Sequence, residues 1–232
     1  MSADEDDFDR LLRDVKLAAM AELAAGAGHE INNPVATIAG RARLLLESET
    51  DPNRRRSLAT IVSQALRIRD MIGDLMLFAR PPQPVPVPCD LREIARDAVA
   101  AFSARAAETS VILAVQDSPP IEILADPTHM AIAIAALVEN ALAAVDHAGQ
   151  VILEFGDRDD HATLTVRDNG RGFTDVDREH AFDPFYSGRQ AGRGLGFGLP
   201  KAWRIVTLAG GTIDVASRPG ETLFTITLPR RA

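Results

Sequence analysis

The sequence predicts an α+β fold, in which an N-terminal helical hairpin is followed by a two-layer α/β sandwich. Three observations carry this prediction: helical apolar spacing before residue 80, five prolines within residues 81–88, and alternating helix and strand patterns thereafter. So many prolines exclude helix interior and favour an extended linker. We therefore expect three parts, at residues 1–80, 81–88 and 89–232.

The first part contains two stretches with apolar residues at helical spacing, residues 8–48 and 54–79. Pro34 should bend the first helix, and Pro52 suits the first turn of the second. Two long helices joined by a short turn form an antiparallel hairpin, whose apolar stripe a single copy cannot bury. Two copies would make a four-helix bundle, so we expect a homodimer through this hairpin.

The third part alternates between helical and strand patterns. The helical patterns cover residues 91–104, 127–145 and 198–209, and the strand patterns cover residues 111–115, 121–125, 151–155, 163–167, 212–217 and 222–228. Helices and mostly antiparallel strands in this order predict a two-layer α/β sandwich.

Composition narrows the class of protein and its partners. Hydrophobic residues make up 46% of the chain and the formal net charge is -8, which argues against nucleic acid as a partner. Cys89 is the single cysteine, which excludes an internal disulfide and fits a cytoplasmic protein. We read no apolar run near the roughly 18 to 20 residues of a membrane span, so we expect no membrane segment in this chain.

His29 stands among polar and small residues in Gly28-His29-Glu30-Ile31-Asn32-Asn33-Pro34. A helical histidine is usually a packed or surface residue, but these neighbours favour chemistry. Glu30 places a carboxylate beside the imidazole, where it could accept a proton. Asn33 lies one turn on, on the same helix face, and could orient a water. Gly26 and Gly28 would let a second domain come close.

Asn140 and Asp168 are candidate binding residues in the third part. Asn140 lies inside an apolar helical run, where it is either a satisfied core amide or an oxygen ligand of Mg²⁺. Asp168-Asn169-Gly170-Arg171-Gly172 follows a strand and is either a simple turn or a site for an adenine amino group. In the second case, Gly170 and Gly172 would let the backbone approach the ring.

Four glycines alternate along Gly192-Arg193-Gly194-Leu195-Gly196-Phe197-Gly198-Leu199, just before a predicted helix. Such a backbone can wrap phosphates, and the helix N-terminus adds donors. The chain lacks the Gly-x-x-x-x-Gly-Lys-Ser/Thr phosphate loop and the Ser/Thr kinase signatures. The remaining histidines show no metal-ligand spacing, and we expect them on the surface: His129, His147, His161 and His180.

Together these segments resemble the sensor histidine kinases of two-component signalling. The approach segment Met20–Gly26 and the His29 box are similar to the phospho-acceptor box, and the later segments are similar to the N, G1, F and G2 boxes of a Bergerat-type ATP-binding domain. The resemblance implies that ATP phosphorylates His29, that Glu30 is the general base, and that the phosphoryl group passes to a response-regulator receiver domain. Glu30 and Asn33 fit the family's acid-x-x-Asn dephosphorylation pattern.

For the ATP-binding domain the resemblance implies ATP and Mg²⁺, with Asn140 as the metal ligand. The residues that it assigns to the nucleotide are Asn140, Asp168, Gly170, Gly172, Phe185, Tyr186, Arg189, Gly192, Arg193, Gly194, Leu195, Gly196, Gly198 and Leu199.

Ala136 departs from the family pattern, which has an asparagine one turn before the metal-binding one. Related ATPases place their hydrolytic glutamate at this turn, so Ala136 argues against a chaperone-like ATPase. It also leaves the nucleotide one polar contact short. The alternative function is therefore a nucleotide-switched phosphatase or scaffold with weak kinase activity.

Overall fold

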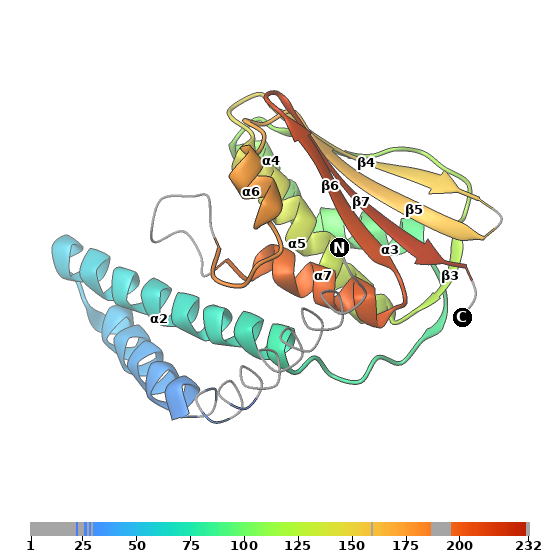
Figure 1. Cartoon of the computed structure of the whole chain (residues 1–232). Helices are drawn as coiled ribbons and strands as arrows, with labels where there is room; N and C mark the ends of the chain where they lie inside the picture. Colours follow the sequence, from blue (N-terminus) through green and yellow to red (C-terminus); the bar gives the residue numbers. More distant parts are fainter. Residues whose placement is uncertain are drawn as a thin grey trace. The chain divides into compact units, whose positions relative to one another are not determined.

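A computed structural model of the chain describes residues 22, 26, 28, 30–158, 160–186 and 196–230 (Figure 1). The chain divides into two compact units, residues 1–82 and 83–232. We describe each unit by itself.

The first unit is a helical hairpin. Its first helix is continuous over residues 30–48 and passes through Pro34, and its second is α2 (Pro52–Ala79). Val35 and Ala39 of the first helix form a buried cluster with Ala65 of α2. At the turn, Arg55 donates to the carbonyl of Glu49 at 2.7 Å. These contacts pair early residues with late ones, so the helices are antiparallel, as the sequence predicted.

The start of α2 is fixed by local capping. The Asp51 side chain accepts from the backbone N–H groups of Asn53 and Arg54, both at 2.9 Å, and Pro52 occupies the first turn. An aspartate cap followed by proline is a strong helix start, because the cap satisfies free N–H groups and proline has none to satisfy.

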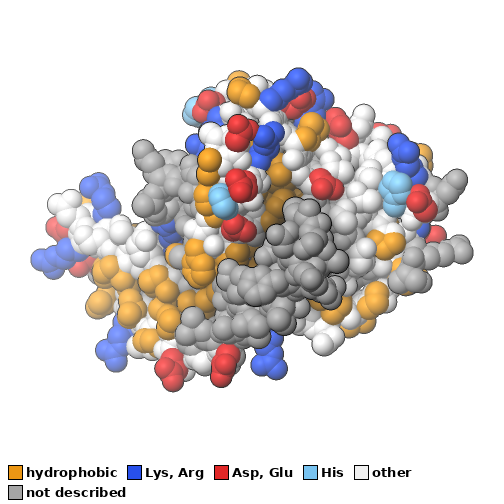
Figure 2. Space-filling view, viewed as in Figure 1, with side chains coloured by type: hydrophobic (Ala, Val, Ile, Leu, Met, Phe, Trp, Pro, Cys, Tyr) orange, Lys and Arg blue, Asp and Glu red, His pale blue; other side chains and the backbone are white. Residues whose placement is uncertain are grey.

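Large hydrophobic side chains remain exposed on this hairpin. Figure 2 shows hydrophobic side chains gathered on it. The exposed residues include two series at seven-residue spacing, Ile31, Ile38 and Leu45 on the first helix and Ile61 and Ile68 on α2. Seven-residue spacing is typical of a bundle seam, so each helix carries an apolar stripe that the single hairpin leaves in solvent.

The second unit is a two-layer sandwich with a five-stranded sheet in the order β2-β4-β5-β7-β6. The strands are β2 (Ile112–Val115), β4 (Gln150–Asp157), β5 (His161–Asp168), β6 (Thr212–Arg218) and β7 (Glu221–Pro229). The helices are α3 (Leu91–Ala100), α4 (Ser103–Glu108), α5 (Pro127–Ala144), α6 (Asp175–Glu179) and α7 (Gly198–Leu208). A separate antiparallel pair joins β1 (Val87–Asp90) to β3 (Glu122–Ala125).

The core lies between one face of the sheet and helices α3, α5 and α7 (Figure 1). Alternate residues of the central strands point into it, such as Leu164 and Val166 of β5, and both are fully buried. Leu137 of α5 and Ile205 of α7 are buried residues of the helical layer. Helix α5 contacts α7 within the helical layer and β5 in the sheet, so it links the two layers.

Helix α5 contradicts the expectation that the chain contains no apolar run of membrane-span length. It spans 18 residues with a mean hydropathy of 1.3, so it has the length and composition of a membrane span, although we read no such run from the sequence. Half of that stretch is buried inside the sandwich. Its apolar character is therefore that of a core helix.

Several short elements differ from the sequence-based expectation. The predicted linker ends in strand β1, which tolerates Pro88 because alternate residues of an edge strand need no ladder hydrogen bond. The expected helix at 91–104 breaks into α3 and α4, α6 was not expected, and β2 pairs with β4 in parallel. The other strand pairs are antiparallel, as expected.

Candidate nucleotide and phospho-acceptor site

Asp168 is the most unusual polar residue of the sandwich. It ends β5, between Val151 of β4 and Thr222 of β7, and is 1% exposed. Its Oδ1 accepts from the Gly170 N–H at 2.9 Å, while its buried Oδ2 has no hydrogen-bond partner within the described residues. Burial raises the pKa of Asp168 to about 6, against the lowering effect of the Gly170 N–H. Such a carboxylate lacks a donor, and an adenine amino group would supply one.

The loop after Asp168 is anchored on two sides. The Arg171 N–H donates to Ala144 at the end of α5, and the Gly220 N–H of the β6–β7 turn donates to the Gly170 carbonyl at 3.1 Å. Gly172 has φ +75, and a side chain there would clash with the Arg218 carbonyl. Backbone atoms of Ala144 and Arg218 occupy the space where side chains at Gly170 and Gly172 would lie, and the contact of these glycines with a nucleotide stays a prediction.

Asn140 lies on α5 one turn before Ala144, so it shares an end of the helix with the Asp168 loop. It is half-buried, and Ala136, one turn earlier, is buried. The neighbouring Glu139 is exposed and forms an ion pair with Arg105 at 3.6 Å. The amide oxygen of Asn140 is a hard ligand suited to Mg²⁺.

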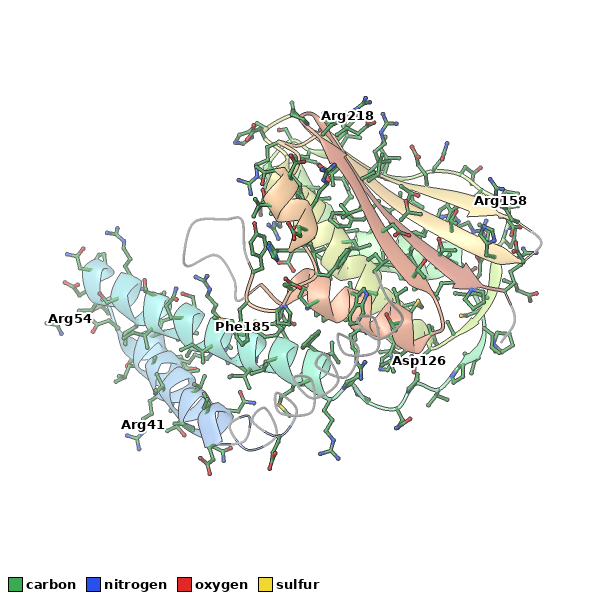
Figure 3. The ribbon with its side chains drawn as sticks, in the orientation of Figure 1. Arg41, Arg54, Asp126, Arg158, Phe185 and Arg218 are labelled. Carbon is green, nitrogen blue, oxygen red and sulfur yellow. The ribbon has the colours of Figure 1, made fainter. Side chains whose placement is uncertain are left out.

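Phe185 and Tyr186 lie next to the start of α7. Phe185 has φ 67, and its ring packs edge-on against the ring of Phe197 with the two ring centroids 4.9 Å apart (Figure 3 labels Phe185). The Tyr186 hydroxyl donates to Asp177 Oδ1 at 2.7 Å. Gly196 has φ +74, and a side chain there would clash with the Tyr186 carbonyl. Both aromatic residues are thus fixed at the base of the Gly-rich segment.

Asp177 is a site residue that the sequence analysis missed. It forms a capping box with Thr174 at the start of α6, and it also binds Tyr186. The spacing Thr-x-x-Asp is the sequence signal that could have revealed this helix start.

Helix α7 begins at Gly198, after Phe197, and within the described residues no side chain caps its N-terminus. Among the described residues, a side chain at Gly198 would meet no atom within 4 Å, so these residues leave space beside the first turn. Leu199 is half-buried. Uncapped N–H groups facing open space suit an anion such as phosphate. The remaining predicted nucleotide residues lie outside the described residues: Arg189, Gly192, Arg193, Gly194 and Leu195.

The predicted acceptor His29 also lies outside the described residues, but its neighbours are described. Glu30 and Asn33 are both exposed on the first helix. Gly28 is buried, and a side chain there would meet Met76 Sδ of α2 at 2.6 Å. The small size of Gly28 therefore serves packing within the hairpin, and the approach of a second domain stays a prediction.

Metal-ligand clusters are absent from the described residues, in which no group of three His, Cys, Asp or Glu side chains could hold a metal. One histidine expectation was wrong: His129 is only 5% exposed, because it faces inward from the first turn of α5. A divalent cation here would depend on Asn140 and on oxygens of the nucleotide.

Comparison with known proteins agrees with this geometry. Residues 19–84 match the model of the His Kinase A (phospho-acceptor) domain, and residues 125–232 match that of the histidine kinase-, DNA gyrase B- and HSP90-like ATPases. Sensor histidine kinase ZraS of Klebsiella oxytoca is 32% identical over 94% of this chain and 47% of its own length. The C4-dicarboxylate transport sensor protein DctB of Rhizobium meliloti is 31% identical over 93% of this chain and 35% of its own.

Solved structures share the fold. Full-length ShkA in complex with AMPPNP has a TM-score of 0.80 at 25% identity, over 91% of this chain and 46% of that one. Histidine kinase ThkA in complex with the response regulator TrrA has a TM-score of 0.69 at 19% identity, over 99% and 67%.

A phospho-acceptor hairpin joined to an ATPase sandwich defines the core of a protein-histidine kinase. The chain belongs to the sensor histidine kinases of two-component systems. It spans about half or less of the length of the curated relatives it matches.

Proposed function

We propose that this chain uses ATP to phosphorylate its own His29 and then transfers the phosphoryl group to an aspartate of a response-regulator receiver domain. One structural observation carries the nucleotide half of this proposal: the buried Asp168 carboxylate, whose Oδ2 lacks a donor among the described residues. The acceptor half rests on the match of residues 19–84 to the phospho-acceptor domain, which includes His29.

The division of labour in the nucleotide site follows from the donor set. Asp168 accepts from the adenine amino group, and the uncapped N-terminus of α7 at Gly198 binds phosphate oxygens. Asn140 contributes an oxygen to Mg²⁺, which neutralises phosphate charge when bound. The predicted residues Arg189 and Arg193 add positive charge toward the same phosphates.

At the acceptor, a neutral ring nitrogen of His29 forms a bond to the γ-phosphorus while the bond to the ADP oxygen breaks. The proton on the other ring nitrogen passes to Glu30, whose exposed carboxylate can release it to water. Most of the rate enhancement comes from positioning and charge stabilisation.

Incubation with γ-labelled ATP tests the proposal. The wild-type chain should take up acid-labile phosphate, and His29→Gln should take up none. His147→Gln is the matched control, because His147 is exposed in the other unit and should leave labelling unchanged. Labelling that persists in His29→Gln would overturn the assignment.

The same proposal covers assembly and partners. The functional parts are the hairpin of residues 1–80, the linker of residues 81–88 and the ATP-binding domain of residues 89–232. The hairpin forms a homodimer and presents His29 to the receiver domain. The acidic chain with its single cysteine fits a cytoplasmic setting without nucleic acid.

Asn33 supports an additional phosphatase activity toward the regulator, since an exposed amide one turn from His29 can orient a water. Asn33→Ala should slow dephosphorylation of the phosphorylated regulator while it leaves autophosphorylation intact. The alternative, a nucleotide-switched phosphatase or scaffold with weak kinase activity, is not favoured, since the chain matches both kinase domain models.

A further inference from the structure

The second half of the linker is bound to the sandwich. Strand β1 pairs antiparallel with β3, with Val87 opposite Ala125. Asp90 closes the end of β1, where its Oδ1 accepts from the Ile121 N–H at 3.1 Å. The chain is therefore fixed from residue 87 onward, and what holds residues 83–86 decides how much of the linker is free.

Asp126 holds the linker one step before β1. Its Oδ1 caps α5 by accepting from the N–H groups of Thr128 and His129 at 2.9 and 3.1 Å. Its Oδ2 accepts from the Val85 N–H at 2.9 Å, across 41 residues of sequence. The Val85 hydrogen bond is the largest cause that lowers the pKa of Asp126, so this side chain is a carboxylate at neutral pH. Figure 3 shows Asp126 between the linker and the start of α5.

Among the described residues, the Val85 hydrogen bond is the polar contact that holds residues 83–86 to the sandwich. The Val85 side chain is 67% exposed, so it adds almost no burial. Pro84 and Pro86 line a hollow of about 400 Å³ whose wall includes His129 and Met130. Prolines have no N–H to donate, so Val85 is one of only two backbone donors within residues 83–86.

We propose that Asp126 is a positioning residue, which clamps Val85 so that only residues 80–84 remain as a free tether between the two units. The proposal rests on the proposed autophosphorylation of His29. Helix α2 ends at Ala79, so five residues, with a reach of about 17 Å, connect it to the clamp. Release of Val85 and Pro86 would extend the reach to about 24 Å. Of two tethers that both span the sites, the shorter one gives the bound ATP a higher effective concentration at His29.

Two substitutions break the clamp from opposite sides. Asp126→Asn keeps one oxygen, which can cap α5 or hold Val85 but not both, and asparagine caps helices as well as aspartate does. Val85→Pro removes the donor at a residue that already precedes a proline and is therefore extended. Val85→Ala is the matched control, since it keeps the N–H and changes only an exposed side chain.

The kinetic test measures autophosphorylation of the full chain at saturating ATP. Asp126→Asn and Val85→Pro should each lower the rate about 1.5- to 2-fold with an unchanged KM for ATP, and Val85→Ala should match wild type. The double variant should be no slower than either single variant, because both remove the same bond. Additive effects, a raised KM, or an unchanged rate in both single variants would overturn the proposal.

Amide hydrogen exchange tests the clamp without reference to activity. The Val85 N–H should be protected in wild type and lose about tenfold of that protection in Asp126→Asn, while Cys89 in β1 stays protected. Free exchange of Val85 in wild type would show that no clamp exists. If wild type took up no phosphate on His29 while Val85 stayed protected, the proposed function would fail and the clamp would stand.

Discussion

At the scale of single residues, Asp168 couples stability to pH. Burial places its pKa at about 6, above the ordinary value of 3.8, so the folded protein binds a proton that the unfolded chain has lost between these values. The free energy of unfolding should therefore decrease as pH rises from about 4 to about 6. At higher pH it should stay at this lower value, because the buried carboxylate is then fully ionised. An adenine amino group would stabilise the carboxylate, so ATP should bind more tightly as pH rises through 6.

Asp168→Asn should raise the stability of the protein but lower its affinity for ATP. The neutral amide can still accept from Gly170, but it removes the buried charge, so the unliganded protein should gain about 1 to 3 kcal/mol at pH 7.5. ATP affinity should fall about tenfold or more, because an amide NH₂ in place of Oδ2 opposes the adenine amino group. Denaturant unfolding and calorimetric titration with ATP measure the two effects. A variant that is no more stable at pH 7.5, or binds ATP as wild type does, contradicts this account.

Ala136 tests whether the nucleotide site lacks one polar contact. Ala136→Asn should lower the stability of the unliganded protein by about 1 to 3 kcal/mol, because it places an amide at a buried position. Affinity for Mg-ATP should rise about 3- to 10-fold, if the new amide reaches the nucleotide. Ala135→Asn is the control, since its side chain leaves the helix in another direction and should give no gain in affinity. Equal affinities for both variants would show that position 136 does not face the nucleotide.

At the scale of helices and strands, two glycines beside the acceptor have opposite surroundings. Gly26 has open space where a side chain would lie, whereas a side chain at Gly28 would meet Met76. Gly26→Ala should therefore stabilise the hairpin by about 1 kcal/mol through helix propensity. Gly28→Ala should stabilise the hairpin less than Gly26→Ala does, or destabilise it. Adding Met76→Ala to Gly28→Ala should restore the stabilising effect of the Gly28→Ala substitution. Thermal unfolding of these three variants and of the Met76→Ala reference measures this, and equal gains from Gly26→Ala and Gly28→Ala would contradict the packing of Gly28 on α2.

The long elements could be predicted because their signals are local. The Asp51-Pro52 cap and the helical spacing that follows give the start and length of α2, and period-two alternation gives β5 and β7. The short elements were not predicted because their sequence signals are weak. The prolines of the linker argued against a strand at β1, and the five residues of α6 are too few to show a helical spacing of apolar residues.

Part of the candidate site could also be predicted, because some of its signals are local. Asp168 could be recognised from its motif, but its isolation in the core depends on Thr222 and Val151, which are distant in sequence. Asp126 before Pro127 reads as a helix cap, yet the hydrogen bond of its second oxygen to Val85 spans 41 residues, and no local pattern encodes it. Non-local contacts of this kind come only from the fold.

At the scale of the whole molecule, the exposed heptad stripes of the hairpin predict a dimer. Ile38→Glu places a charge in the middle of the stripe on the first helix, where Ile38 is 51% exposed in the single hairpin. If two hairpins bury this stripe, the charge loses its hydration on assembly, so the variant should be monomeric. Light scattering after size exclusion should give twice 25.0 kDa for wild type and 25.0 kDa for the variant.

The matched control for the dimer is Ile112→Glu, since Ile112 is 61% exposed but lies on β2 of the sandwich. This variant should remain dimeric, which separates loss of the hairpin seam from a general effect of added charge. Because Ile38 is exposed within the single hairpin, the monomeric variant should keep the helical content of wild type by circular dichroism. A dimeric Ile38→Glu variant, or a monomeric Ile112→Glu variant, would contradict an interface on the seven-residue stripes and would favour one on the sandwich.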